Sequence, residues 1–296
     1  MDEMIKQVAS TYVFPAVIAF VMFGLGLSLK KQDLVAVAKK PTPFIVGLGG
    51  QLIFLPLVAF AAAIVLPVPM AIILGLILIS LCPGGSTSNA IIFSIGGNVA
   101  LSVALTIASS LITLFSIPLL LAFAVDYFSV EAGAIAVPAA KIFKSLLLMT
   151  AIPVALGMIV GVKMPQFAEK AIPPLKKLSL ILILMIIALS VYNAREFITE
   201  EIGTIILSAG SLSLAVVLGG YFLSRLFVAD LGNRLTIAVE IGVQNTPIAI
   251  FLGSSVLNMP ELSIVAIAYG VFNYGLIAVL IKASGRNNSG AAVQQA

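Results

Sequence analysis

Nine long apolar stretches make up most of this chain and leave it very few ways to fold. A helix needs about 20 consecutive apolar residues to cross the hydrocarbon layer of a membrane. Hydrophobic residues make up 61% of the chain and charged residues 9%, whereas about a quarter of the residues in a soluble domain are charged. The sequence therefore predicts an all-α polytopic membrane protein with nine transmembrane helices, over residues 11–29, 42–65, 69–95, 98–124, 138–162, 174–193, 203–228, 231–257 and 259–283.

The 16 basic residues outnumber the 12 acidic residues and lie mainly in short loops between the apolar stretches. This distribution indicates no nucleic-acid partner. Basic residues favour cytoplasmic loops, and placing the amino terminus outside puts 12 of the 16 on or near the cytoplasmic side. Because nine is odd, the carboxyl terminus then lies in the cytoplasm. We expect a multi-pass protein of the inner (plasma) membrane. Its first stretch lacks a small-residue cleavage pattern and is expected to be a retained helix rather than a signal peptide.

The chain has no His, no Trp and one Cys, Cys82. Ser-His-Asp triads, zinc sites built from His or Cys, and disulfides are therefore excluded. An intramembrane hydrolase with Ser86 or Ser88 as nucleophile would need a nearby base. The nearest lysines in a span, Lys141 and Lys144, are predicted near the outer surface. We expect no enzyme, no organic cofactor and no transition metal.

One carboxylate, Glu240, lies deep inside a predicted span. It comes nine residues after the start of the 231–257 stretch, which is about 14 Å along a helix and close to the middle of the membrane. An ionisable group there costs about 2.5 kcal/mol or more. A structural role would require a buried basic partner, and no basic residue lies at comparable depth. Glu240 is therefore a functional-site candidate.

Two predicted spans carry helix-breaking residues near their centres. Residues 240–247 include Pro247, which lacks an N–H group and disfavours helical geometry at the residue before it. Residues 82–89 place a proline and two glycines between two short apolar segments. Neither the 70–81 half nor the 86–95 half is long enough to cross alone. Both spans are therefore predicted to be broken helices.

The two broken spans are third and eighth of the nine, and each is followed by an intact span. Corresponding broken helices in two halves are typical of an inverted-repeat secondary transporter, with its binding sites near the midplane. The amino termini of half-helices attract anions, while free carbonyls and Glu240 suit a cation. The pattern favours coupled transport of an organic anion with Na⁺.

At these residues the chain resembles the bile acid:sodium symporter family over nearly its whole length. The order and spacing of several short motifs carry the resemblance. They are FGLGLSL at 23–29, Gln51 before Pro56, CPGGSTSN at 82–89, GNVALS at 97–102 with Thr106, and EIGVQN at 240–245.

The resemblance implies two Na⁺ sites behind the crossing of the broken helices. The first would use Ser88, Asn89, Ser102, Thr106 and Glu240. The second would use Glu240, Gln51, Gln244 and the backbone carbonyls of Ile241 and Val243. Ser102 and Thr106 are four residues apart and so share a helix face, although small hydroxyl residues also let membrane helices pack closely.

The resemblance also implies an organic anion held at the two breaks. Contacts are expected from Ser86, Thr87 and Asn245, with Asn273 and Tyr274 as weaker candidates. No Arg or Lys lies deep in a span, which favours a carboxylate bound by dipoles and neutral donors over a strong ion pair. Bile acids, pantoate, pyruvate and similar carboxylates all stay open.

The family fold has a core and a flatter panel, with substrate between them. The panel is expected over residues 11–65 and 174–228, and the core over 69–162 and 231–283. Nine spans instead of the ten common in bacterial members imply that the first panel helix is missing. Residues 284–296 read as a disordered tail. We expect a single transporter domain in the bilayer, as a monomer or a weak homo-oligomer.

Two other functions stay open. Related inverted-repeat families export organic acids in a proton-coupled or uncoupled manner, and Glu240 could titrate instead of binding Na⁺. A membrane sensor that binds its ligand without transporting it is the alternative from another class.

Overall fold

The computed structural model describes residues 4, 7–29, 41–128 and 137–285. Within these ranges the chain is helical, and seven helices are long and apolar enough to cross a membrane. The prediction of an all-α membrane protein is confirmed. Two more apolar helices, Met70–Leu81 and Thr246–Val256, are shorter and belong to the spans predicted to be broken. The count of nine spans stays a prediction. Of the expected tail, Ser284 and Gly285 form a turn that is hydrogen-bonded to the end of the last helix, and residues 286–296 lie outside the described residues.

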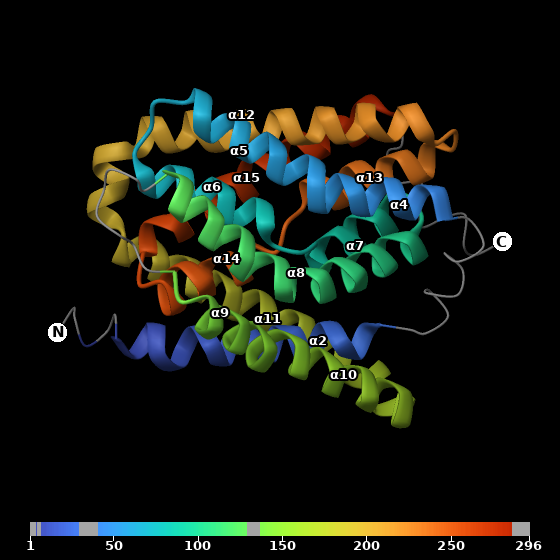
Figure 1. Cartoon of the computed structure of the whole chain (residues 1–296). Coiled ribbons are helices and arrows are strands. Elements are labelled where there is room, and N and C mark those ends of the chain that lie inside the picture. Colours follow the sequence, from blue (N-terminus) through green and yellow to red (C-terminus); the bar gives the residue numbers. More distant parts are fainter. Residues whose placement is uncertain (1–3, 5–6, 30–40, 129–136, 286–296) are drawn as a thin grey trace.

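The helices follow one another with few long connections (Figure 1). Four segments, η1 to η4, are π-helical turns inside longer helices. In chain order the elements are η1 (Ala9–Val13), α2 (Phe14–Ser28), α4 (Pro41–Gly49), η2 (Gly50–Phe54), α5 (Leu55–Val65), α6 (Met70–Leu81), α7 (Ser86–Ser94), α8 (Val99–Phe128), α9 (Ala139–Leu146), η3 (Leu147–Ala151), α10 (Ile152–Lys163), α11 (Pro165–Asn193), α12 (Arg195–Phe227), α13 (Leu231–Gly242), α14 (Thr246–Phe251), η4 (Leu252–Val256) and α15 (Pro260–Ala283).

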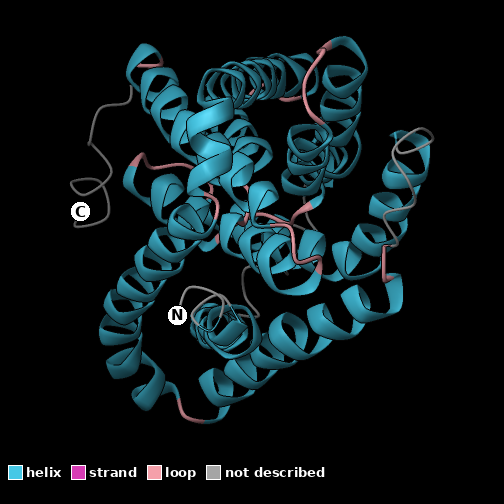
Figure 2. Cartoon of the chain, turned by 90° about the vertical axis from the view of Figure 1, so that its left-hand side faces the viewer, coloured by secondary structure: helices cyan, strands magenta, loops and turns pink. Residues whose placement is uncertain are grey.

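Both predicted helix breaks are present, and the two unwound segments lie against each other. The segment between α6 and α7 pairs with the one between α13 and α14 through an antiparallel bridge from Gly84 to Gln244. The backbone N–H of Asn245 donates to the carbonyl of Pro83 at 2.9 Å. Unwound backbone is tolerated inside a membrane only where protein or a wet cavity satisfies it. Here each unwound segment provides hydrogen-bond partners for part of the other segment's backbone. Figure 2 shows loops inside the helical bundle as well as at its ends.

Three of the π-helical turns end two residues before a proline: Pro15, Pro56 and Pro153. In each case the residue before the proline donates its N–H to the carbonyl five residues back, as Leu55 does to Gly50. Proline has no N–H group and its ring crowds the preceding turn, so the helix widens locally instead of ending. The η2 turn contains Gln51, one of the expected ligands.

The helices pack in two groups that differ from the expected panel and core. One group, called the three-helix group below, consists of α2, α9–α10 and α11. The remaining helices pack around α6, α8, α13 and α15. Thus α4–α5 and α12, expected in the panel, pack with the broken helices. The α10 part of the α9–α10 helix, expected in the core, packs on α2, whereas α9 itself contacts α8. These helices are apolar on every side, so their sequences do not indicate which neighbouring helix each face contacts.

Glycines allow α10 and α2 to approach closely. A Cβ atom added at Gly157 would come within 2.8 Å of the backbone nitrogen of Leu27. Small residues at such positions let membrane helices pack backbone against backbone. The three-helix group therefore has a tight internal contact.

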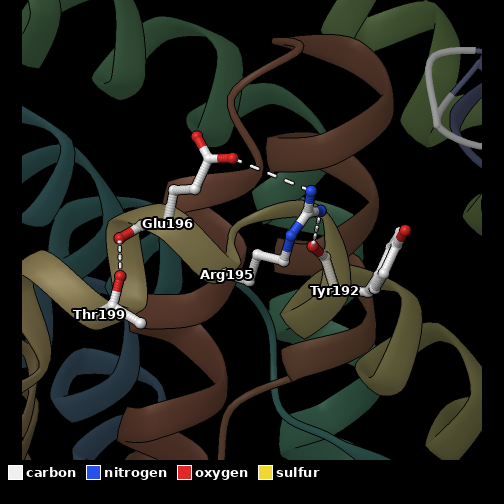
Figure 3. A network of polar contacts seen from close by, with 4 residues as sticks. All are labelled: Tyr192, Arg195, Glu196 and Thr199. Atoms are coloured by element: carbon white, nitrogen blue, oxygen red, sulfur yellow. Dashed lines mark hydrogen bonds and ion pairs between the residues drawn. The ribbon is translucent and has the colours of Figure 1, made fainter.

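A single residue, Ala194, separates α11 of the three-helix group from α12 of the remaining helices. The Arg195 guanidinium donates to the Tyr192 carbonyl at 3.0 Å and lies 4.7 Å from the centre of the Tyr192 ring. It also lies 3.9 Å from the Glu196 carboxylate (Figure 3). We call this arrangement the elbow. Other direct connections between the two groups pass through 30–40 and 129–136, outside the described residues.

Candidate functional site

Glu240 lies in the last turn of α13 and is fully buried. The Ser102 hydroxyl on α8 is 2.5 Å from Glu240 Oε1, and the Thr106 hydroxyl is 3.3 Å from Oε2. Ser88 on α7 also contacts the carboxylate. Among the described residues, no Lys or Arg forms an ion pair with it. Four of the five residues expected at the first sodium site are thus brought together from three helices.

Asn89, the fifth residue, joins this cluster through Ser102. The Ser102 oxygen is 2.6 Å from Asn89 Oδ1 as well as 2.5 Å from Glu240 Oε1. A hydroxyl has one hydrogen to donate, so it cannot serve both acceptors. Turning the Asn89 amide would supply a donor but no positive charge. The cluster has more acceptor oxygens than donors around a carboxylate.

The remaining hydroxyl hydrogens near Glu240 have other acceptors. Ser88 donates to the Gly85 carbonyl at 2.6 Å, and Thr106 is 3.1 Å from the Ser102 carbonyl. With Asn89 oriented as in the structure, donors are therefore few around the carboxylate. Oxygen-rich surroundings with few donors are suited to a hard cation.

A second cluster adjoins the first on the side of α4–α5. Gln51 and Gln244 are both buried, and their amides meet at 3.5 Å. The Gln51 Oε1 atom is buried and accepts no hydrogen bond. A Cβ atom added at Gly84 would lie 2.9 Å from Glu240 Oε2 and 3.1 Å from Gln51 Nε2. Only a glycine at position 84 leaves this space between the two clusters open.

The two backbone carbonyls expected at the second sodium site already accept hydrogen bonds. Gln244 Nε2 donates to the Ile241 carbonyl at 2.7 Å, and the Gly85 N–H donates to the Val243 carbonyl at 3.4 Å. A carbonyl oxygen has two lone pairs. Both oxygens therefore keep capacity for a further contact.

The residues expected to bind substrate form two sets. Thr87, exposed near the start of α7, has its hydroxyl 2.8 Å from the Tyr274 hydroxyl on α15. Asn245 is buried and caps α14 by accepting from the Ile248 N–H at 3.3 Å. Asn273 is buried, and neither polar atom of its amide has a hydrogen-bond partner. Ser86 is the first residue of α7.

Two buried polar residues near the breaks were not predicted. The Ser109 hydroxyl accepts from the Gly84 N–H at 3.4 Å, and the Tyr269 hydroxyl donates to the Gly242 carbonyl at 2.8 Å. Ser109 follows Thr106 by three residues and Ser102 by seven, so helical spacing could have identified it. Tyr269 precedes Asn273 by four residues on α15, which is the same kind of signal.

Comparisons with known proteins agree with the resemblance stated from the motifs. The model of the Sodium Bile acid symporter family matches residues 15–201. The "Uncharacterized sodium-dependent transporter YocS" of Bacillus subtilis (strain 168) is 33% identical over 240 residues, covering 80% of this chain and 72% of that protein. The mouse "Ileal sodium/bile acid cotransporter" is 31% identical over 95% of this chain and 80% of its own length.

A plant relative is longer than this chain. The rice "Probable sodium/metabolite cotransporter BASS2, chloroplastic" is 27% identical over 86% of this chain, but the match covers only 59% of the rice protein. The family model matches well over half of the chain, and two relatives are more than 30% identical to it. The chain belongs to the sodium bile acid symporter family, and it is a membrane transporter of the sodium-coupled type rather than an enzyme.

Proposed function

We propose that this protein imports an organic anion together with Na⁺ by alternating access. The observation that carries the proposal is the environment of Glu240: a fully buried carboxylate among hydroxyl and amide oxygens, with no basic partner among the described residues. A buried charge must be paired or neutralised. A cation at this cluster would neutralise the carboxylate and use the surplus acceptors.

The proposal includes two Na⁺ ions. The first is held by Glu240 and its neighbours on α7 and α8, and the unpartnered Oε1 of Gln51 supports a second beside it. The two ions would join ligands that come from α7, α8, α13 and the η2 turn. Filling the sites would therefore fix the relative positions of the two breaks, and so prepare the anion site next to them.

The driving force follows from the charges. Two Na⁺ and one monoanion carry one net positive charge inward, which gains roughly 2.3 kcal/mol per 100 mV of membrane potential. Both the sodium gradient and an inside-negative voltage would drive uptake. The proposed orientation, with the amino terminus outside, follows the distribution of basic residues.

The anion would bind at the two breaks, where α7 and α14 begin. Thr87, Tyr274, Asn245 and Asn273 offer neutral donors there. The mouse relative is named for bile acid and the rice relative for a metabolite, so a carboxylate is the substrate class we propose. The antiparallel pairing of the breaks supports an inverted repeat, and the three-helix group would move against the remaining helices.

Transport into proteoliposomes tests the proposal. Labelled pyruvate, pantoate and cholate are offered at fixed pH with an inside-negative potential, with either Na⁺ or K⁺ outside. Uptake of at least one acid that requires Na⁺ and increases with voltage is expected. Uptake that is equal in K⁺ but follows a pH gradient would favour the proton-coupled alternative, because Glu240 could carry a proton instead. Saturable binding without uptake would favour a sensor.

A further inference from the structure

The hydroxyl of Tyr274 lies at the place where a substrate oxygen would meet the start of α7. Its oxygen is 2.8 Å from the Thr87 hydroxyl. The two residues come from helices with different neighbours, because α7 packs against α8 and α13, whereas α15 packs against α12, α6 and α14. The Tyr274 side chain therefore spans the space between α15 and the first break.

This pair of hydroxyls faces accessible space at the depth of a helix break. Thr87 is exposed, and Tyr274 is 41% exposed. The contact between the two hydroxyls uses one of their two hydrogens. Facing hydrocarbon, the other hydrogen would have no acceptor, at a cost of about 1–3 kcal/mol. The space that they face is more favourable for water or a polar ligand than for lipid.

A second, independent observation points to a polar ligand at the other break, where the Asn273 amide lies against Gly242. Gly270, Asn273, Tyr274 and Ile277 share one face of α15 by their spacing. On this face the Asn273 amide is 2% exposed and unpartnered, and a Cβ atom added at Gly242 would lie 3.0 Å from its Oδ1. A buried amide without a partner costs free energy. A ligand between the breaks would supply the missing hydrogen bonds.

We propose that Tyr274 limits the size of the transported anion, so that the substrate is a short-chain carboxylate rather than one with a steroid-sized ring system. This inference rests on the proposed function. A small carboxylate would take the place of the phenol oxygen as the partner of Thr87. A ring system would require the whole phenol ring to leave the space between α15 and α7.

Chemical labelling tests the steric role of Tyr274 without any transported substrate. The only native thiol, Cys82, is 1% exposed, so Thr87→Cys introduces a single accessible thiol in the full-length protein in detergent. A small methanethiosulfonate and a bulky fluorescein maleimide are reacted with this variant. The same reactions are run after adding Tyr274→Ala, Tyr274→Phe or, as a matched control, Val271→Ala, which truncates an exposed side chain on the same helix.

Tyr274→Ala is expected to accelerate the bulky label about tenfold, the size of effect that pocket shape produces in discrimination between ligands. The small label should change much less. Tyr274→Phe keeps the ring and should leave the bulky label slow, as should Val271→Ala. An equally fast reaction of the bulky label with and without the Tyr274 ring would overturn the inference.

Transport gives the second measurement. Native protein should take up pyruvate or pantoate about tenfold better than cholate, and Tyr274→Ala should reduce that ratio. Native protein that moves cholate as well as pantoate would refute the size limit. If native protein takes up none of the three with Na⁺, the proposed function fails, and the labelling rates still decide whether Tyr274 restricts access.

Discussion

At the scale of single residues, Glu240 is the one charged side chain that is buried among the described residues. It is fully buried, and its contacts are hydroxyl groups that each have a second acceptor nearby. Removing one partner from a buried ion pair costs about 3–5 kcal/mol because the remaining charge is uncompensated. Glu240 is in that uncompensated situation until a cation or a proton joins it.

Glu240→Gln should remove the sodium dependence of stability while leaving the protein folded. Gln has nearly the same shape and no charge, so the variant should be at least as stable as native protein without Na⁺. Native protein should gain about 2.7 kcal/mol at 100 times the dissociation constant, measured as the shift of thermal unfolding between NaCl and KCl. Glu200→Gln, on the exposed surface of α12, is the control. A full sodium shift in Glu240→Gln would contradict the assignment.

Ser102→Ala tests whether hydroxyl oxygens bind the ion. A hydrogen bond or ligand contact to a charged group contributes about 1.5–3 kcal/mol, so the variant should bind Na⁺ about tenfold or more weakly. The measurement is the Na⁺ concentration at half-maximal thermal stabilisation. Ser110→Ala is the matched control on the same helix, because its hydroxyl donates to the Thr106 carbonyl at 2.6 Å instead of facing Glu240. Equal losses of affinity in both variants would argue against a ligand role for Ser102.

The sequence could identify the acid but not the pairing of the neutral polar groups. A carboxylate in an apolar stretch is visible without a structure, and Ser102 and Thr106 follow from their spacing along one helix. The contact between Thr87 and Tyr274 joins residues 187 positions apart, and no local pattern relates them. The unpartnered Asn273 amide could not be predicted either, because hydrogen-bond satisfaction depends on how the helices pack.

At the scale of elements, the two unwound segments hold each other and bring Gly84 against the ion site. Gly84 is not among the described glycines with positive φ, which are Gly96 and Gly285. Gly84 is therefore needed for the space that it leaves beside Glu240 and Gln51, and not for an unusual backbone conformation.

Gly84→Ala should impair sodium binding by crowding the carboxylate. The added Cβ would lie 2.9 Å from Glu240 Oε2, and overpacking a well-packed site costs about 1–3 kcal/mol. Loss of sodium-dependent stabilisation and uptake is expected, with a folded protein by size-exclusion chromatography. Gly49→Ala is the control, because its Cβ would meet no atom within 4 Å. Unchanged sodium affinity in Gly84→Ala would show that the ion lies elsewhere.

The helix breaks were predictable because proline, glycine and polar residues interrupt apolar stretches. The π-helical turns were not, since a proline inside a helix such as Pro56 can kink, end or widen it, and only the surrounding packing selects one outcome. The helix contacts of α4–α5, α10 and α12 differ from the expected grouping, and the division into panel and core stays a prediction. Most spans are apolar all round, so their sequences do not specify which helix each one meets.

At the scale of the whole molecule, several contacts between the three-helix group and the remaining helices gather toward the end that carries the amino terminus. There η1 and α9 contact η4, and α9 also contacts α8. At the same end the elbow at Ala194 connects α11 directly to α12 (Figure 1). Motion of one group against the other would have to break the contacts at η4 while the elbow keeps the groups joined.

Lys141→Met should weaken the closed arrangement at that end. The Lys141 ammonium on α9 donates to the Val256 carbonyl at 3.0 Å, and a cation at a helix carboxyl terminus contributes about 0.3–1 kcal/mol. Loss of 1 kcal/mol would shift the ratio of the two arrangements about fivefold. Spin labels are attached at Lys163→Cys and Arg225→Cys, which are exposed near the far ends of α10 and α12. The population of molecules with the shorter distance between the two labels should increase. Lys144→Met, one turn along α9, is the control, and identical distance distributions for both lysine variants would rule out Lys141 as a latch.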